Sequence, residues 1–194
     1  MDERRVIAET RAWVERAVIG LNLCPFAKAP QVKGLVRYVV CAADSEAGLQ
    51  ASLVAELKLL AQATPDEIET TLLIHPGVLH DFFDYNDFLD VADAAVADLD
   101  LQGVIQVASF HPQYQFAGSA EGDITNATNR SPYPTLHLLR EASVERAVAA
   151  FPQAQAIFDA NQATLHALGP QAWARLQQAC RDDAAAALEP GAQP

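Results

Sequence analysis

Short hydrophobic runs and longer amphipathic repeats alternate along the first half of the chain. Leu35–Ala42, Glu69–His75 and Gly103–His111 are rich in hydrophobic and β-branched residues, and such runs are typical of strands. Between them, residues 49–60 and 84–99 place hydrophobic side chains at helical spacing. The order strand, helix, strand, helix, strand favours βαβ crossovers, which pair their strands in parallel.

The remaining pattern is mostly helical. An amphipathic helix is predicted from Arg4 to Ile19, and a series of helices is predicted from Ser131 or Thr135 to a last helix that contains Ala184. Tyr114–Phe116 could add an antiparallel edge strand. We therefore predict an α/β fold with a small, mainly parallel three-stranded sheet, a possible antiparallel edge strand, flanking helices and a helical C-terminal third.

Length and composition indicate one globular domain. The 194 residues are 51% hydrophobic and 20% charged, and they contain no long repeat or internal linker. We expect a single globular domain over residues 1–187 and a frayed tail over residues 188–194. The formal net charge of −12 would repel phosphate groups, which argues against nucleic acid and anionic membranes as partners. The sequence does not indicate an oligomeric state.

The start of the chain and the cysteines bear on the cellular location. The first residues are charged and lack the apolar segment of a secretory signal peptide, and no run approaches the roughly 20 apolar residues that span a bilayer. Cys24, Cys41 and Cys180 lack the spacing of a metal or redox site. We expect reduced thiols and a cytoplasmic protein.

Two predicted strands end in the same way, with His75-Pro76 and His111-Pro112. Proline cannot continue a strand, so each histidine lies where its strand stops. In parallel strands both imidazoles would lie at the carboxyl edge of the sheet, where open α/β sheets bind ligands, whereas antiparallel strands would separate them. His75 and His111 are therefore candidate catalytic residues, and with a carboxylate they could hold a divalent metal ion. The alternative is that each ring bonds a loop carbonyl.

Cys24 lies between Leu23 and Pro25, just after the first predicted helix. It is a candidate nucleophile, provided that a histidine lowers its pKa and the thiol meets solvent. The alternative is a small hydrophobic residue within the core.

The stretch from Phe110 to Pro134 is an unusually long loop with little hydrophobic periodicity. Arg130 precedes Ser131-Pro132, and an arginine beside a helix start could hold a carboxylate or a phosphate. Alternatively, Arg130 pairs with Glu121 or Asp123 and pins the loop.

Other side chains of this loop could hold a substrate or order the loop itself. Asn126, Asn129 and Tyr114 join Arg130 as candidate substrate-binding residues, although asparagines also tie turn backbones together. The aromatic side chains favour an ordered loop. Farther along, His137 and Glu141 would share one helix face, where a surface pair is the simpler interpretation.

Five segments resemble a known family: LNLCPFA, LLIHP, DYNDFLDVAD, VASFHPQYQFAG and TNRSPYPTLHLLREASVERAV. Together they are similar to the uncharacterised bacterial family called domain of unknown function 1415. The resemblance runs from about Trp13 to Trp173 and includes Cys24, His75 and His111. It implies kinship and no particular activity.

Two hypotheses for function follow. The first is a small enzyme that acts on an anionic small molecule, through acid/base chemistry of His75 or His111 or through metal-assisted hydrolysis. The alternative is a non-catalytic module that binds a metabolite or a protein partner, for which an exposed apolar patch would favour the protein partner.

Overall fold

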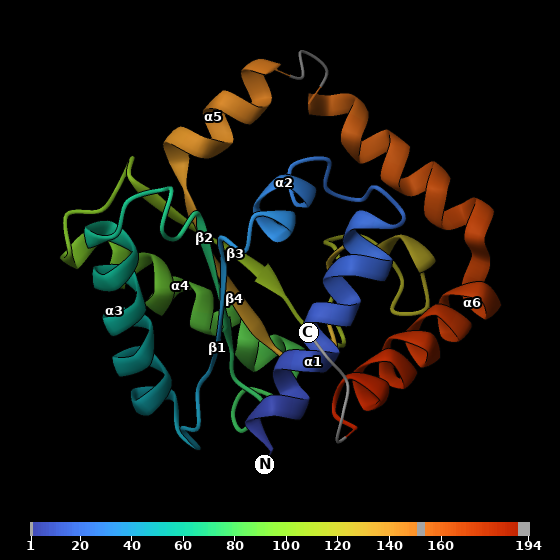
Figure 1. Cartoon of the computed structure of the whole chain (residues 1–194), viewed down its shortest axis with the longest axis horizontal. Coiled ribbons are helices and arrows are strands. Elements are labelled where there is room, and N and C mark those ends of the chain that lie inside the picture. The colour runs from blue at the N-terminus through green and yellow to red at the C-terminus, as the bar shows by residue number, and fades with distance from the viewer. Residues whose placement is uncertain (1, 151–153, 190–194) are drawn as a thin grey trace.

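In the computed structural model of the chain, which describes residues 2–150 and 154–189, a four-stranded sheet separates two layers of helices (Figure 1). The strands are β1 Val36–Val40, β2 Thr70–Ile74, β3 Ile105–Phe110 and β4 Thr135–Arg140. Their spatial order is β1-β2-β4-β3. β1 and β2 are parallel, and β4 is antiparallel to both of its neighbours, so β2 and β3 run in the same direction.

The α/β class is confirmed, but the prediction of a mainly parallel three-stranded sheet was wrong. The sheet is four-stranded and mixed, and its antiparallel member is the inner strand β4, in a segment predicted to be helical. Leu136 and Leu138 of β4 are fully buried. Because both faces of an inner strand are covered, its leucine-rich sequence cannot be told from a buried helical segment by periodicity. Tyr114–Phe116, the predicted edge strand, lies in the loop after β3.

Two helices cover one face of the sheet, α3 Glu46–Gln62 and α4 Phe82–Asp98. Ser45 caps α3 by accepting from the backbone N–H of Gly48, and Asp81 caps α4 by accepting from that of Phe83. The leucines that predicted α3 are fully buried against the sheet, namely Leu49, Leu53, Leu57 and Leu60.

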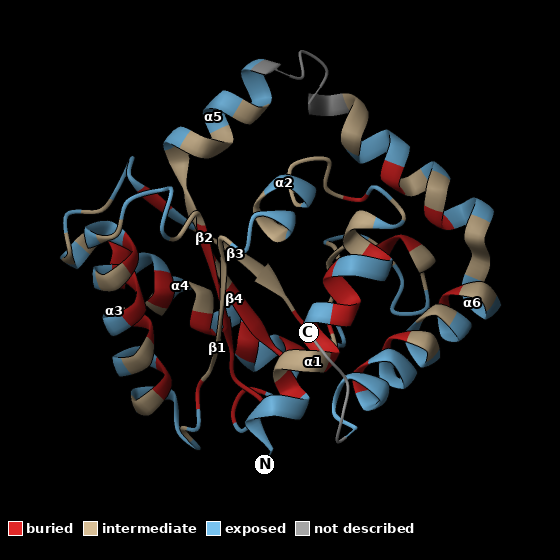
Figure 2. Ribbon diagram, in the orientation of Figure 1, coloured by how far each residue is buried: buried red, intermediate tan, exposed pale blue. Residues whose placement is uncertain are grey.

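On the other face lie α1 Glu3–Trp13, the π-helix η1 Val14–Ile19 and α2 Lys28–Val32, and α6 Ala154–Ala187 packs against α1 on the side away from the sheet (Figure 1). Figure 2 shows both buried and exposed residues along α1, and its buried side chains include Val6, Thr10 and Trp13. α6 bends at Gly169, whose φ of 71° interrupts the helix before Pro170. Its second half packs along α1 and η1, where Arg16 pairs with Asp183.

α5 Glu141–Ala150 continues directly from β4. The long loop between β3 and β4 contains the short 3-10 helix η2 Ile124–Asn129. None of the described helices is long and apolar enough to cross a membrane. Residues 190–194 of the predicted frayed tail lie outside the described residues.

Candidate functional site

The sheet topology brings His75 and His111 to the same edge, because β2 and β3 run in the same direction. Both side chains are fully buried. Each ring packs against Tyr85 of α4, with ring centroids 5.7 Å from it for His75 and 5.0 Å for His111. The two histidines and Tyr85 therefore form one buried aromatic cluster.

Both imidazoles bond the turn that follows β2. His75 bonds the carbonyl oxygen of Val78 through Nδ1 at 3.2 Å, and His111 bonds that of Leu79 through Nε2 at 3.1 Å. The backbone N–H of Gln113 donates to Nδ1 of His111. Burial lowers the pKa of His75 to about 4 and also lowers that of His111. In this neutral state the rings hydrogen-bond backbone groups of the neighbouring loops. Neither histidine lines the two cavities described below.

The side chain of Arg130 bonds backbone groups of the long loop. Its guanidinium donates to the carbonyl oxygens of Tyr114, at 3.1 Å, and Glu121, at 2.7 Å. It pins the loop through backbone carbonyls rather than through the carboxylates of Glu121 or Asp123. Arg130 also lines a small cavity of about 240 Å³ beside α1 and α6.

The candidate asparagines and tyrosine also make contacts that order the long loop. The fully buried Asn126 accepts from the N–H of Phe116 and the hydroxyl of Ser119, and it donates to the carbonyl oxygen of Ala120. Asn129 donates to the carbonyl oxygen of Ser109 at the end of β3. The ring of Tyr114 packs against Phe82 and Phe116. The loop is thus an ordered, internally bonded element.

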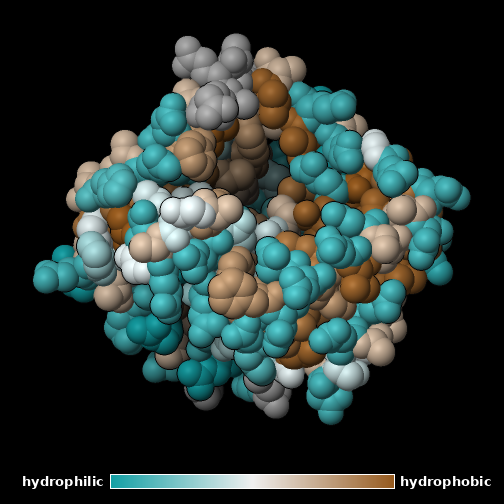
Figure 3. Space-filling view, turned by 180° about the vertical axis from the view of Figure 1, so that it is seen from behind, coloured by the Kyte–Doolittle hydropathy of each residue, from teal (hydrophilic) through white to brown (hydrophobic). Residues whose placement is uncertain are grey.

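A larger cavity lies on the face covered by α1 and η1, toward the amino ends of β1 and β2. We call it the main cavity; its volume is about 680 Å³. Figure 3 shows a hollow in the upper part of the back face, bordered by hydrophobic side chains. The cavity is bordered by the sheet, η1, α2 with the loop before it, and α5. The main cavity thus lies away from the carboxyl edge that the sequence favoured.

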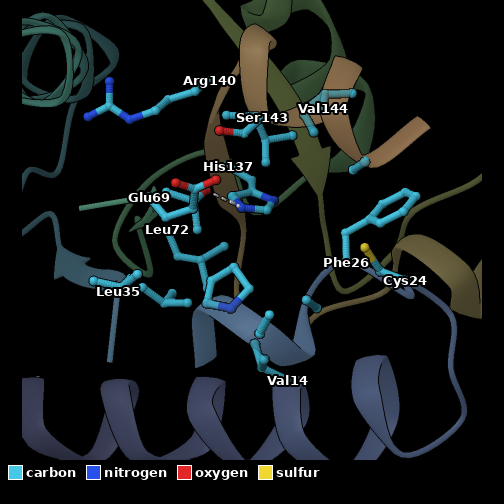
Figure 4. Close-up of a pocket in the computed structure, with 18 of the residues that line it drawn as sticks. Val14, Cys24, Phe26, Leu35, Glu69, Leu72, His137, Arg140, Ser143 and Val144 are labelled. Carbon is cyan, nitrogen blue, oxygen red and sulfur yellow. Dashed lines mark hydrogen bonds between the residues drawn. The ribbon is translucent and has the colours of Figure 1, made fainter. Parts of the chain in front are cut away.

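The lining of the main cavity is mainly apolar. Its floor is made by side chains of β2, β3 and β4, and its walls by η1, the loop before α2, and α5 (Figure 4). The hydrophobic lining includes Val14, Val18, Phe26, Leu35, Leu72, Ala108, Phe110, Leu139, Val144 and Ala147. The π-helix forms part of the wall, and single π turns recur at functional sites.

His137 is the imidazole on this floor, and sequence reasoning missed it. Its Nε2 lies 2.7 Å from Oγ1 of Thr70, whose hydroxyl donates to the carbonyl oxygen of Leu138. Burial lowers the pKa of His137 to about 4, so the ring is neutral at pH 7. The alternation in Thr135–Arg140 was the only signal, because it puts His137 on the same face as Thr135 and Leu139.

Charged side chains lie at the margin of the main cavity. Figure 4 shows the guanidinium of Arg140 directed away from the cavity, and it donates to the carbonyl oxygens of Leu60, Ala63 and Ile68. Arg146 lies 3.9 Å from the carboxylate of Glu69. Lys33 and Asp66 also line the margin and are exposed.

Cys24 lines the main cavity, as Figure 4 shows, and is half-buried. The side chain of Asn161 on α6 donates to the carbonyl oxygen of Leu23 and fixes the loop that carries the thiol. Burial raises the pKa of Cys24, although the N–H groups of Phe26 and Ala27 oppose the shift. Cys41 and Cys180 are buried in the core.

A metal site is not formed by the side chains that the structure describes. Within residues 2–150 and 154–189, no three His, Cys, Asp or Glu side chains come together as a metal would require. The pair of histidines proposed from the sequence therefore lacks its carboxylate in this arrangement.

Comparison with protein families identifies the kinship of the chain. The family described as protein of unknown function (DUF1415) matches residues 5–175. The chain belongs to this family. The match spans the strands, the long loop and every residue cited above for the main cavity. No curated protein and no solved structure is significantly similar to the chain.

Proposed function

We propose that this member of the DUF1415 family binds a small, largely hydrophobic organic molecule in the main cavity. The observation that carries the proposal is a hollow of about 680 Å³ with an apolar lining and an imidazole on its floor. Sites for small molecules are usually concave, mostly apolar and between roughly 300 and 1,000 Å³, with a few placed polar groups.

The proposal follows the binding-module hypothesis. Nδ1 of His75, both ring nitrogens of His111 and the polar side chains of the long loop bond backbone groups, which favours a structural role for these residues. Acid/base chemistry of His75 or His111, a nucleophilic Cys24 and metal-assisted hydrolysis stay predictions. So does binding of an anionic substrate through Arg130, Asn126, Asn129 and Tyr114.

Filling the cavity tests the proposal. Ala108 lies on the floor, opposite His137 in the pairing of β3 with β4. Ala108→Phe should place a ring in the hollow, whereas Ala94→Phe adds the same ring to the exposed side of α4, on the other side of the sheet. Binding of 2-naphthol and of other uncharged aromatic and aliphatic probes would be measured by isothermal titration calorimetry.

We expect saturable binding of the probe by the unmodified protein and by Ala94→Phe. The affinity of Ala108→Phe should be weaker by about tenfold or more, because the introduced phenyl ring occupies the space that the probe needs. Equal affinities in all three proteins would contradict the proposal, as would the absence of binding by every probe.

A further inference from the structure

The hydrogen bonds of His137 determine what a molecule in the main cavity can bond to. A threonine hydroxyl carries one hydrogen, and that of Thr70 is directed at the carbonyl oxygen of Leu138, 2.7 Å away. Oγ1 of Thr70 must then accept from Nε2 of His137, also 2.7 Å away. The structure therefore assigns the Nε2–H tautomer to His137 and leaves Nδ1 as an acceptor.

Nδ1 of His137 is open to a ligand. It has no hydrogen-bond partner among the described residues, whereas Nε2 is the nitrogen that contacts Thr70, and Figure 4 shows the imidazole beside the cavity. Nε2 of His75, in contrast, also lacks a partner among the described residues but is sealed from solvent. Since a neutral ring nitrogen with a lone pair can only accept, the matching ligand group is an O–H or N–H donor.

The charges around the cavity are poorly suited to a carboxylate. The guanidinium of Arg140 is occupied by backbone carbonyls, and that of Arg146 donates to the hydroxyl of Ser143 at 2.9 Å and lies 3.9 Å from the carboxylate of Glu69. Lys33 is exposed at the margin, with Asp66 and Glu69 also lining this region. A carboxylate beside His137 would thus lose water without gaining a cation, which is costly.

The ring contacts around His137 favour an aromatic or otherwise flat ligand. The ring centroid of Phe110 lies 5.9 Å from that of His137, and the ring of Trp13 meets Phe110 edge-on at 5.3 Å. Such rings give apolar contact area and favour offset or edge-to-face packing with another ring.

On the basis of the binding function above, we propose that the main cavity selects an uncharged hydrophobic molecule whose hydroxyl group donates to Nδ1 of His137, and that it rejects the matching carboxylate. The ligand class is thus a phenol or a similarly hydrophobic alcohol. This differs from the anionic ligand that the sequence suggested through Arg130, which lies at the small cavity.

Three probes of similar shape test the selection: 2-naphthol, 2-methylnaphthalene and 2-naphthoate. We expect 2-naphthol to bind the unmodified protein roughly 2- to 10-fold more tightly than 2-methylnaphthalene, the usual net effect of a hydrogen bond. Binding of 2-naphthoate should be at least about 100-fold weaker than that of 2-naphthol. In His137→Phe, 2-naphthol should lose its advantage over 2-methylnaphthalene.

The tautomer gives a second readout that needs no variant. Nitrogen-15 shifts of the two ring nitrogens distinguish a protonated from an unprotonated nitrogen, and we expect a protonated Nε2 and a bare Nδ1 in His137 at pH 7. Addition of 2-naphthol should shift the Nδ1 resonance and leave Nε2 protonated.

The outcomes separate this inference from the proposed function. Equal affinities for 2-naphthol and 2-methylnaphthalene, tightest binding of 2-naphthoate, or a protonated Nδ1 would overturn the inference while the cavity remained a binding site. Failure of all three probes to bind would overturn the proposed function, and the inference with it.

Discussion

The side chains of Thr70 and His137 meet across the pairing of β2 with β4, with 2.7 Å between Oγ1 and Nε2. The contact is diagonal, because Thr70 pairs in register with Leu139 and His137 pairs with Leu72. It fixes one ring nitrogen of His137 to the sheet and leaves the other beside the main cavity. The antiparallel strand β4 thus supplies both the sheet's inner packing and the polar group of the proposed site.

Replacement of Thr70 by valine should destabilise the protein. Thr70→Val removes the acceptor of His137 and the donor to Leu138, and a buried polar group left without its partner costs about 1–3 kcal/mol. Urea denaturation would measure the change in the free energy of unfolding. Thr71→Val is the matched control, since the hydroxyl of Thr71 is fully buried and has no partner among the described residues. It should be neutral or stabilising, and an equal loss in both variants would contradict the role given to Thr70.

Tyr85→Phe should also destabilise the protein. The hydroxyl of Tyr85 donates to the carbonyl oxygen of Thr135 at 2.8 Å and accepts from the N–H of Phe110 at 3.1 Å, so its removal takes one hydrogen-bond partner from each of these two backbone groups. We expect a loss of about 1–3 kcal/mol by the same measurement. Tyr114→Phe removes a hydroxyl that has no bond to the described residues, and its effect should stay within about 0.5 kcal/mol. A larger loss in the free energy of unfolding for Tyr114→Phe than for Tyr85→Phe would contradict the role given to the hydroxyl of Tyr85.

The free energy of unfolding should fall on acidification from pH 6.5 to pH 4. The pKa values of His75 and His137 are about 4 in the folded protein, against an ordinary value of 6.5. In this range the unfolded chain takes up protons that the folded protein does not. The contribution of these neutral histidines to the free energy of unfolding is therefore complete above pH 6.5 and is lost as the pH falls toward 4. For His75 the loss in the free energy of unfolding is about 3 kcal/mol.

His75→Asn isolates this contribution to the pH dependence. Its amide can replace Nδ1 as donor to the carbonyl oxygen of Val78, and it does not titrate. Urea denaturation at a series of pH values should give a shallower slope for the variant than for the unmodified protein between pH 6.5 and pH 4. Identical slopes would mean that the pKa of His75 is not depressed in the folded state.

Cys24 should report on occupation of the main cavity. Because burial raises its pKa, its alkylation by iodoacetamide should be slow at pH 7 and faster at pH 9, and 2-naphthol should slow it further. Mass spectrometry of the labelled peptides would give the rates, with the buried Cys41 as internal control. Rapid labelling at pH 7 would instead fit the activated nucleophile considered from the sequence.

The sequence predicted the placement of His75 and His111 and left their role open between catalysis and a bond to a loop carbonyl. Each is followed by proline, and the parallel direction of β2 and β3 put both at one edge, as the strand order suggested. Whether a strand-end histidine faces a cavity or a backbone carbonyl depends on the conformation of the neighbouring turn. Here the turn through Val78 and Leu79 folds over the rings and takes up their hydrogen bonds.

His137 could not be recognised from the sequence because its segment was misassigned. Ser131-Pro132 resembles a helix start, the leucines around His137 fit either period, and a true helix begins at Glu141. In a helix, His137 would lie near Glu141 on the surface. In β4 it lies on the sheet beside Thr70, a contact between residues far apart in the chain that no local pattern encodes.

The most direct test of the account is to locate a bound probe by nuclear magnetic resonance. Titration of 2-naphthol into the nitrogen-15-labelled protein should shift backbone amides that line the main cavity, with the largest changes at Cys24, Ala108, His137 and Val144. Amides of Arg130 and Tyr133 at the small cavity should stay in place. Shifts confined to Arg130 and Tyr133, or to the carboxyl edge around His75 and His111, would contradict the claim that the main cavity is the binding site.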